Sequence, residues 1–150
     1  MTYAMAYVLA LVGFVILDIL WLKTMGSYLY RQVLGDILVE DIRKIPAIAF
    51  YLMYPAGLVL FAVAPAIKNG SIGSALIYGA LFGLFTYGTY ELTNYATLRN
   101  WTLQITLVDI GYGMIVSGLV ALLVALILPS VLQLVGARRL AAASQQSLPV

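Results

Sequence analysis

Residues 46–65 read PAIAFYLMYPAGLVLFAVAP, a stretch without a single charged side chain. A helix needs about 20 mostly apolar residues to cross the hydrocarbon core of a bilayer, so this stretch predicts a transmembrane helix. Pro46 suits a first helical position, and Pro65 suits a helix end. Pro55 lies inside the stretch, where a membrane helix tolerates a kink if neighbouring groups satisfy the freed carbonyl.

Three more stretches of the chain are long and apolar enough to cross a membrane. They cover about residues 3–22, 74–98 and 102–128, each with one acidic residue. The apolar residues come in runs and do not alternate with polar ones, which argues against a transmembrane β-barrel. The first stretch has no Lys or Arg before Lys23 and is too long for a signal-peptide core, so we expect a permanent span. The sequence therefore predicts an all-α membrane protein, a four-transmembrane-helix bundle forming a single domain over residues 1–129.

The composition excludes several classes of protein. Of the residues, 63% are apolar and 9% are charged, whereas soluble domains have about 45–50% and roughly 25%. The chain has no cysteine and no histidine, which excludes disulfides, thiolate sites, imidazole bases and histidine-ligated zinc. A net charge of +2 is too small to indicate nucleic-acid binding. We expect the lipid bilayer as the surroundings, no nucleic-acid partner and no cofactor.

Two segments lie outside the predicted spans. In the connection 23–45, apolar residues from Leu29 to Ile42 recur near helical spacing, with charged residues between them. This pattern predicts a short amphipathic helix in the membrane interface, between the first and second spans. The final segment, 130–150, is expected to be a polar and partly disordered tail.

The distribution of Lys and Arg predicts the orientation of the bundle. The loop after the first span carries four and the loop after the third span carries one, which gives five, against three on the other side. Cytoplasmic loops are enriched in these residues. We expect a multi-pass protein of the cell membrane with loops 1 and 3 in the cytoplasm.

Three acidic residues fall within the spans: Asp18, Glu91 and Asp109. An ionised group at mid-bilayer costs about 2.5–3.5 kcal/mol on insertion scales, so such residues are functional candidates by default. Asp18 is expected roughly 6 Å from the end of the first span, and Glu91 roughly 10 Å from the end of the third, at about 1.5 Å per residue. Asp109 is expected roughly 10 Å after the start of the fourth span. All three acids are therefore predicted to share one leaflet.

Helical spacing places polar or small residues on one face of the third and fourth spans. On the third span Glu91 shares a strip with Gly83, Tyr87 and Asn94, with Gly79 beside it; a Gly79–Gly83 pair permits close approach of another helix. On the fourth, Asp109 is aligned with Gly113, Ser117 and two threonines, and Tyr112 is adjacent. We expect an inward-facing pocket that binds a small solute, with these candidate substrate-binding residues: Asp18, Tyr51, Tyr54, Tyr87, Tyr90, Glu91, Asn94 and Asp109. The two tryptophans, Trp21 and Trp101, fit the aromatic belt of a membrane interface.

Several of these segments resemble one family. They are DILWL at 18–22, FYLMY at 50–54, GLFTYGTYELTN at 83–94 and LVDI at 107–110, with Trp101 between the last two. They are similar to the small predicted membrane proteins grouped as domain of unknown function 2177. The resemblance covers nearly everything before the tail. It implies a membrane protein and no particular activity, and it supports a matched set of residues: Asp18, Tyr87, Glu91, Asn94 and Asp109.

Three functions fit the residues, and the sequence leaves all three open. The first is proton-linked binding or transport of a small polar or cationic solute, because a buried carboxylate can release a proton when a cation binds. Four spans are few for a transporter, so this function requires a homodimer or a partner membrane protein. The second is an accessory or scaffold subunit, whose acids pair with Lys23, Arg99 or tyrosine hydroxyls. The third is an intramembrane enzyme that acts on a lipid or isoprenoid by carboxyl acid/base chemistry.

Overall fold

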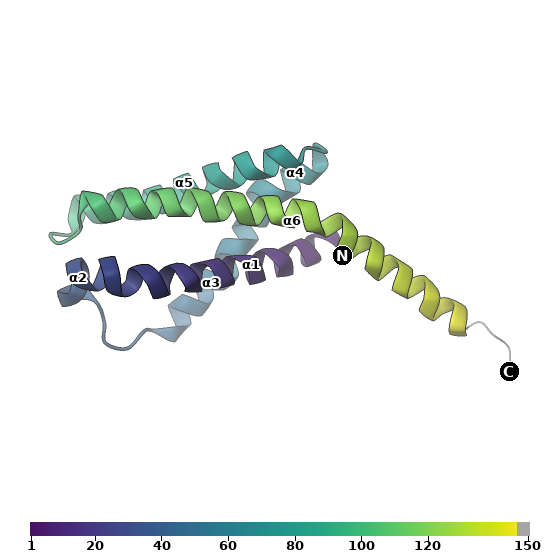
Figure 1. Cartoon of the computed structure of the whole chain (residues 1–150), viewed down its shortest axis with the longest axis horizontal. Coiled ribbons are helices and arrows are strands. Elements are labelled where there is room, and N and C mark those ends of the chain that lie inside the picture. Colours follow the sequence, from purple (N-terminus) through teal and green to yellow (C-terminus); the bar gives the residue numbers. More distant parts are fainter. Residues whose placement is uncertain (147–150) are drawn as a thin grey trace.

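The computed structural model describes the backbone of residues 1–146 and the side chains of residues 1–35 and 37–138. Over these residues the chain is helical and contains no strand (Figure 1). The elements in chain order are α1 (Thr2–Met25), the π-helix η1 (Gly26–Tyr30), α2 (Arg31–Leu34), the 3₁₀ turn η2 (Gly35–Ile37), α3 (Lys44–Leu58), the π-helix η3 (Val59–Val63), α4 (Ala64–Lys68), α5 (Ile72–Thr97) and α6 (Leu103–Gln146).

Four helical segments of the described chain are long and apolar enough to cross a membrane. They cover Thr2–Leu34, Lys44–Lys68, Ile72–Thr97 and Leu103–Arg138. Each contains one of the predicted spans nearly in full, so the predicted all-α, four-span architecture is confirmed. Pro55 lies inside α3, and the π-helix η3 begins four residues after it. The second span therefore stays helical through its proline with a local change of helix type.

The spans form an elongated bundle in which α6 is the common neighbour. It packs most extensively against α5 and next against α1, and α3, η3 and α4 cross obliquely behind them (Figure 1). The turns α2–α3 and α5–α6 lie at one end, and the N-terminus and the α4–α5 turn lie at the other (Figure 1). The ends of the first and third spans and the start of the fourth therefore meet at one end of the bundle.

The segment expected as a separate amphipathic helix is joined to the first span. The helix continues from α1 through η1, α2 and η2 to Ile37 without a break. Leu29 and Leu34 are buried against Ile105 at the start of α6, so this extension packs onto the end of the bundle. Val33 is partly buried against the same cluster, whereas Ile37, Leu38 and Ile42 are exposed.

The segment expected as a partly disordered tail is helical as far as the structure describes it. α6 continues past Pro129 to Gln146, and residues 147–150 lie outside the described residues. A proline removes one hydrogen bond and kinks a helix, and α6 changes direction in its yellow-green part (Figure 1). The residues after the proline include Leu, Val, Ala and Arg. Most of these residue types favour helix, so the helix continues beyond the proline.

The apolar core lies toward the end of the bundle that holds the N-terminus. Ala6, Ala10 and Phe14 of α1 are fully buried there against α3, η3 and α6. The small alanines let the neighbouring helices approach α1 closely. This apolar packing leaves the opposite end of the bundle for the buried acids.

Candidate functional site

The carboxyl of Glu91 on α5 is buried, with 1% of the residue exposed. The indole Nε1 of Trp101 donates to its Oε2 at 2.9 Å. Trp101 lies in the turn between α5 and α6, and the backbone N–H of Trp101 donates to the carbonyl of Leu98 at 3.2 Å. This bond folds the turn so that the indole points back into the bundle.

Asp109 on α6 lies beside Glu91, and the two carboxyls are within reach of each other. Asp109 is 8% exposed. The hydroxyl of Tyr30 donates to its Oδ1, and the indole of Trp21 donates to the Tyr30 hydroxyl at 2.9 Å. A chain of donors therefore runs from α1 through η1 to the acid on α6.

Asp18 on α1 is the third buried acid, with 6% of the residue exposed. The hydroxyl of Tyr51 on α3 donates to its Oδ2 at 2.6 Å, and the hydroxyl of Tyr112 on α6 donates to its Oδ1 at 3.4 Å. Tyr112 also stacks on Trp21, with ring centroids 4.1 Å apart and planes 8° apart. This stacked pair links the environment of Asp18 to the Trp21–Tyr30–Asp109 chain.

Tyr54 and Tyr87 are two further aromatic residues of the site, and both pack into or against the apolar core. Tyr54 is buried, stacks on Phe14 at 4.5 Å and hydrogen-bonds to Ser117 at 2.7 Å. The ring of Tyr87 meets those of Tyr54 and Tyr112 edge to face, with centroids 5.9 and 6.0 Å apart. Neither tyrosine hydrogen-bonds to an acid, so both contribute to the site through the packing of their rings.

The structure brings six of the predicted site residues together and places two at the edge. The central six are Asp18, Tyr51, Tyr54, Tyr87, Glu91 and Asp109. Tyr90 is 58% exposed and packs edge to face against Trp101, with centroids 5.7 Å apart. Asn94 is half-buried, with its side chain close to Tyr90. These two residues border the outer side of Glu91.

A close approach of α5 to α6, which the Gly79–Gly83 pair permits, positions Glu91 beside Asp109. A Cβ at Gly79 would lie 2.6 Å from the carbonyl oxygen of Ser117, and a Cβ at Gly83 would collide with the backbone of Gly113. A Cβ at Gly113 would in turn collide with the ring of Tyr87. Only glycine fits at these positions, so the two helix backbones touch.

Sequence reasoning missed the role of Tyr30 and assigned Trp21 and Trp101 to the interface belt. In a regular α-helix Tyr30 lies about 180° around the axis from Trp21, because nine residues separate them. The π-helix η1 adds about one residue to the turn, which reduces the angle to about 80°. Helical periodicity alone cannot place Tyr30 near Trp21, so no sequence signal identified it.

The hydrogen bonds to the three acids come from uncharged aromatic donors, namely three tyrosine hydroxyls and one indole. Lys23 and Arg99, which the sequence offered as counter-charges, are exposed. In the described part of the chain, no group of three or more Asp or Glu side chains is arranged to hold a metal ion. The site thus combines buried carboxyl oxygens, uncharged hydrogen-bond donors and aromatic rings.

Comparison with known proteins assigns the chain to a family without assigning it an activity. No curated protein and no solved structure matches it. The family model described as "Predicted membrane protein (DUF2177)" matches residues 3–126, which include all three buried acids. The chain therefore belongs to this family of predicted membrane proteins, as the resemblance of its segments predicted.

Proposed function

We propose that the protein binds a small cationic solute at Glu91 and Asp109 in exchange for a proton, and that it moves this solute across the cell membrane. The observation that carries the proposal is the position of two buried carboxyls side by side, with hydrogen bonds from uncharged donors only. Within the described residues no basic side chain hydrogen-bonds to these acids, and a bound cation supplies the positive charge.

Electrostatics connects the cation to the proton. Two unit charges about 4 Å apart interact by about 4 kcal/mol at an effective dielectric constant of 20. Two adjacent carboxylates therefore avoid ionising together, and an empty site retains a proton. A bound monovalent cation offsets the repulsion, so the second carboxyl ionises and its proton leaves. Binding of one cation then releases about one proton.

A bundle of four spans leaves little room for a complete pathway, so we propose that transport requires a second copy of the chain or another membrane protein. The excess of Lys and Arg in the loops after the first and third spans favours a cytoplasmic position for those loops. Glu91 lies six residues before the end of α5 and Asp109 six residues after the start of α6, so both carboxyls lie toward that end of the bundle. The proposed site is thus closer to the cytoplasmic side of the membrane.

The test is proton release from purified protein in lipid nanodiscs, followed with a pH dye in weak buffer. Sodium, potassium and tetramethylammonium chlorides are added separately. We expect about one proton per bound cation for at least one of them, and loss of this release in Glu91→Gln and Asp109→Asn. Glu40→Gln is the matched control, because Glu40 is an exposed acid in a loop, and it keeps the wild-type response.

One observation favours a structural role for the acids as a second candidate function. Every buried side-chain N or O atom in the described part of the chain has a hydrogen-bond partner, as expected in an accessory subunit with a stable polar core. In that case wild-type protein releases no proton with any cation. Glu91→Gln and Asp109→Asn then lower only the resistance to thermal unfolding.

A further inference from the structure

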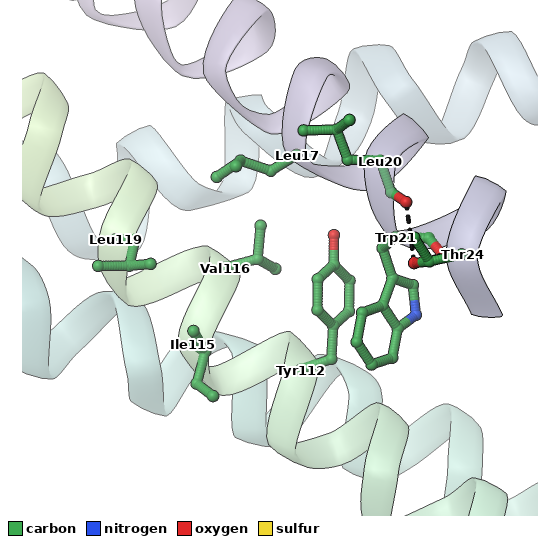
Figure 2. Close-up of a pocket in the computed structure, with 8 residues that line it drawn as sticks. All are labelled: Leu17, Leu20, Trp21, Thr24, Tyr112, Ile115, Val116 and Leu119. Atoms are coloured by element: carbon green, nitrogen blue, oxygen red, sulfur yellow. Dashed lines mark hydrogen bonds between the residues drawn. The ribbon is translucent and has the colours of Figure 1, made fainter.

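A groove of about 290 Å³ lies between α1 and α6, beside the stacked Trp21–Tyr112 pair. Leu17, Leu20, Ile115, Val116 and Leu119 give it an apolar lining (Figure 2). Trp21, Thr24 and Tyr112 complete the lining (Figure 2). Leu20, Ile115 and Leu119 are 56%, 63% and 42% exposed, so the groove opens sideways toward the lipid.

Two residues belong both to this groove and to the carboxyl site. Tyr112 lines the groove and donates to Asp18, while Trp21 lines the groove and donates to Tyr30, which bonds Asp109. The wall between groove and site therefore consists of one stacked aromatic pair. The contact from Tyr112 to Asp18, at 3.4 Å, is longer than that from Tyr51, at 2.6 Å, so Tyr112 is the more easily displaced partner.

The groove and the carboxyl site together suit a molecule that has an apolar part and a positive charge. The groove offers an apolar lining, the wall offers aromatic rings that attract cations, and the site behind it offers carboxyl oxygens with uncharged donors. We infer that the groove holds the apolar part of a lipophilic organic cation, which enters sideways from the bilayer with its charged head toward the buried carboxyls of the site. This inference rests on the proposed function and specifies the class of its solute.

Three probes distinguish the contribution of the ligand's apolar tail from that of its charged head. Hexyltrimethylammonium and tetramethylammonium carry the same cationic head, and only the first has an apolar tail, while 1-hexanol has the tail without the charge. Binding to the protein in nanodiscs is measured by calorimetry, with empty nanodiscs subtracted, and proton release is measured with a pH dye. We expect hexyltrimethylammonium to bind at least about tenfold more tightly than tetramethylammonium and 1-hexanol.

Filling the groove tests its part in this difference. Leu119→Trp places a large side chain in the groove, and Leu123→Trp makes the same change one turn along α6 at a similarly exposed residue that does not line the groove. We expect Leu119→Trp to remove the tenfold advantage of the hexyl tail and to leave tetramethylammonium binding unchanged. Leu123→Trp keeps the advantage. Ile115→Trp is a second groove variant if Leu119→Trp does not fold.

The outcomes separate the two proposals. If both cations release protons but the groove variants bind hexyltrimethylammonium as wild type does, the groove inference is overturned and the proposed function stands. If 1-hexanol binds as tightly as hexyltrimethylammonium, the groove takes lipid tails without regard to charge, and the inference is also overturned. If neither ammonium ion releases a proton from wild-type protein while sodium or potassium does, the inference is overturned and the proposed function stands. If none of these cations releases a proton, both fail.

Discussion

Helix α6 packs against its two main neighbours in opposite ways. Toward α5, a Cβ at Gly79 would lie 2.6 Å from a backbone oxygen of α6, so the helices touch through their backbones. Toward α1, the large rings of Trp21 and Tyr112 stand between the helices and leave a groove of about 290 Å³ beside them. The comparison shows that small residues fix the acids of α5 and α6 together, while large aromatic residues provide the donors and the space on the other side.

We expect the largest effect on stability from a methyl group added at the close interface between α5 and α6. Gly83→Ala places a Cβ against the backbone of Gly113, and we expect the free energy of unfolding to fall by about 3 kcal/mol, at the upper end of overpacking costs. Gly88→Ala is the control on the same helix, because a Cβ there meets nothing within 4 Å, and alanine favours helix over glycine by up to about 1 kcal/mol. Unfolding titrations in mixed micelles measure both, and equal stabilities would refute the close contact.

A smaller effect is expected from removing a hydroxyl on the aromatic side. Tyr30→Phe removes the donor to Asp109 and the acceptor for Trp21, and each unmet buried group costs about 1–3 kcal/mol. We expect a loss of about 2 kcal/mol in the same unfolding titration. Tyr28→Phe, two residues earlier and 69% exposed, should change stability by less than about 0.5 kcal/mol. A similar result for the two variants would show that the Tyr30 bridge adds no stability.

The smallest effect distinguishes the two partners of Asp18. Tyr51→Phe removes a hydrogen bond of 2.6 Å, and Tyr112→Phe removes one of 3.4 Å while keeping the stacked ring. Because longer hydrogen bonds are weaker, we expect losses of about 1 kcal/mol for Tyr51→Phe and less than about 0.5 kcal/mol for Tyr112→Phe. If Tyr112→Phe proves the more damaging, Tyr112 is not the displaceable wall of the groove.

Hydropathy and helical spacing predicted the four spans and the inward face that joins Glu91 to Asp109. These signals succeed because burial and lipid exposure divide each helix into two faces. The Gly79–Gly83 spacing permitted a close helix approach, and the structure shows that α6 is the helix that makes it. Depth counting placed Asp18 near the other acids because helix rise is constant along a span.

The same signals failed where the backbone departs from regular α-helix. η1 rotates Tyr30 toward Trp21 and carries the first span on to Leu34, and no residue pattern marks such an insertion. The indole of Trp101 is turned inward by the α5–α6 turn, whereas its sequence position suggested the interface belt. Turn geometry and tertiary contacts decide both placements, and neither is encoded in periodicity.

Both tryptophans of the chain donate their indole N–H into the network around the acids, Trp101 directly to Glu91 and Trp21 through Tyr30. Indole emission responds to nearby charge, and all of the tryptophan fluorescence of this protein arises within or beside its polar centre. Protonation of the acids, or binding of a ligand beside them, should therefore change the wavelength or the intensity of the tryptophan emission of the unlabelled protein.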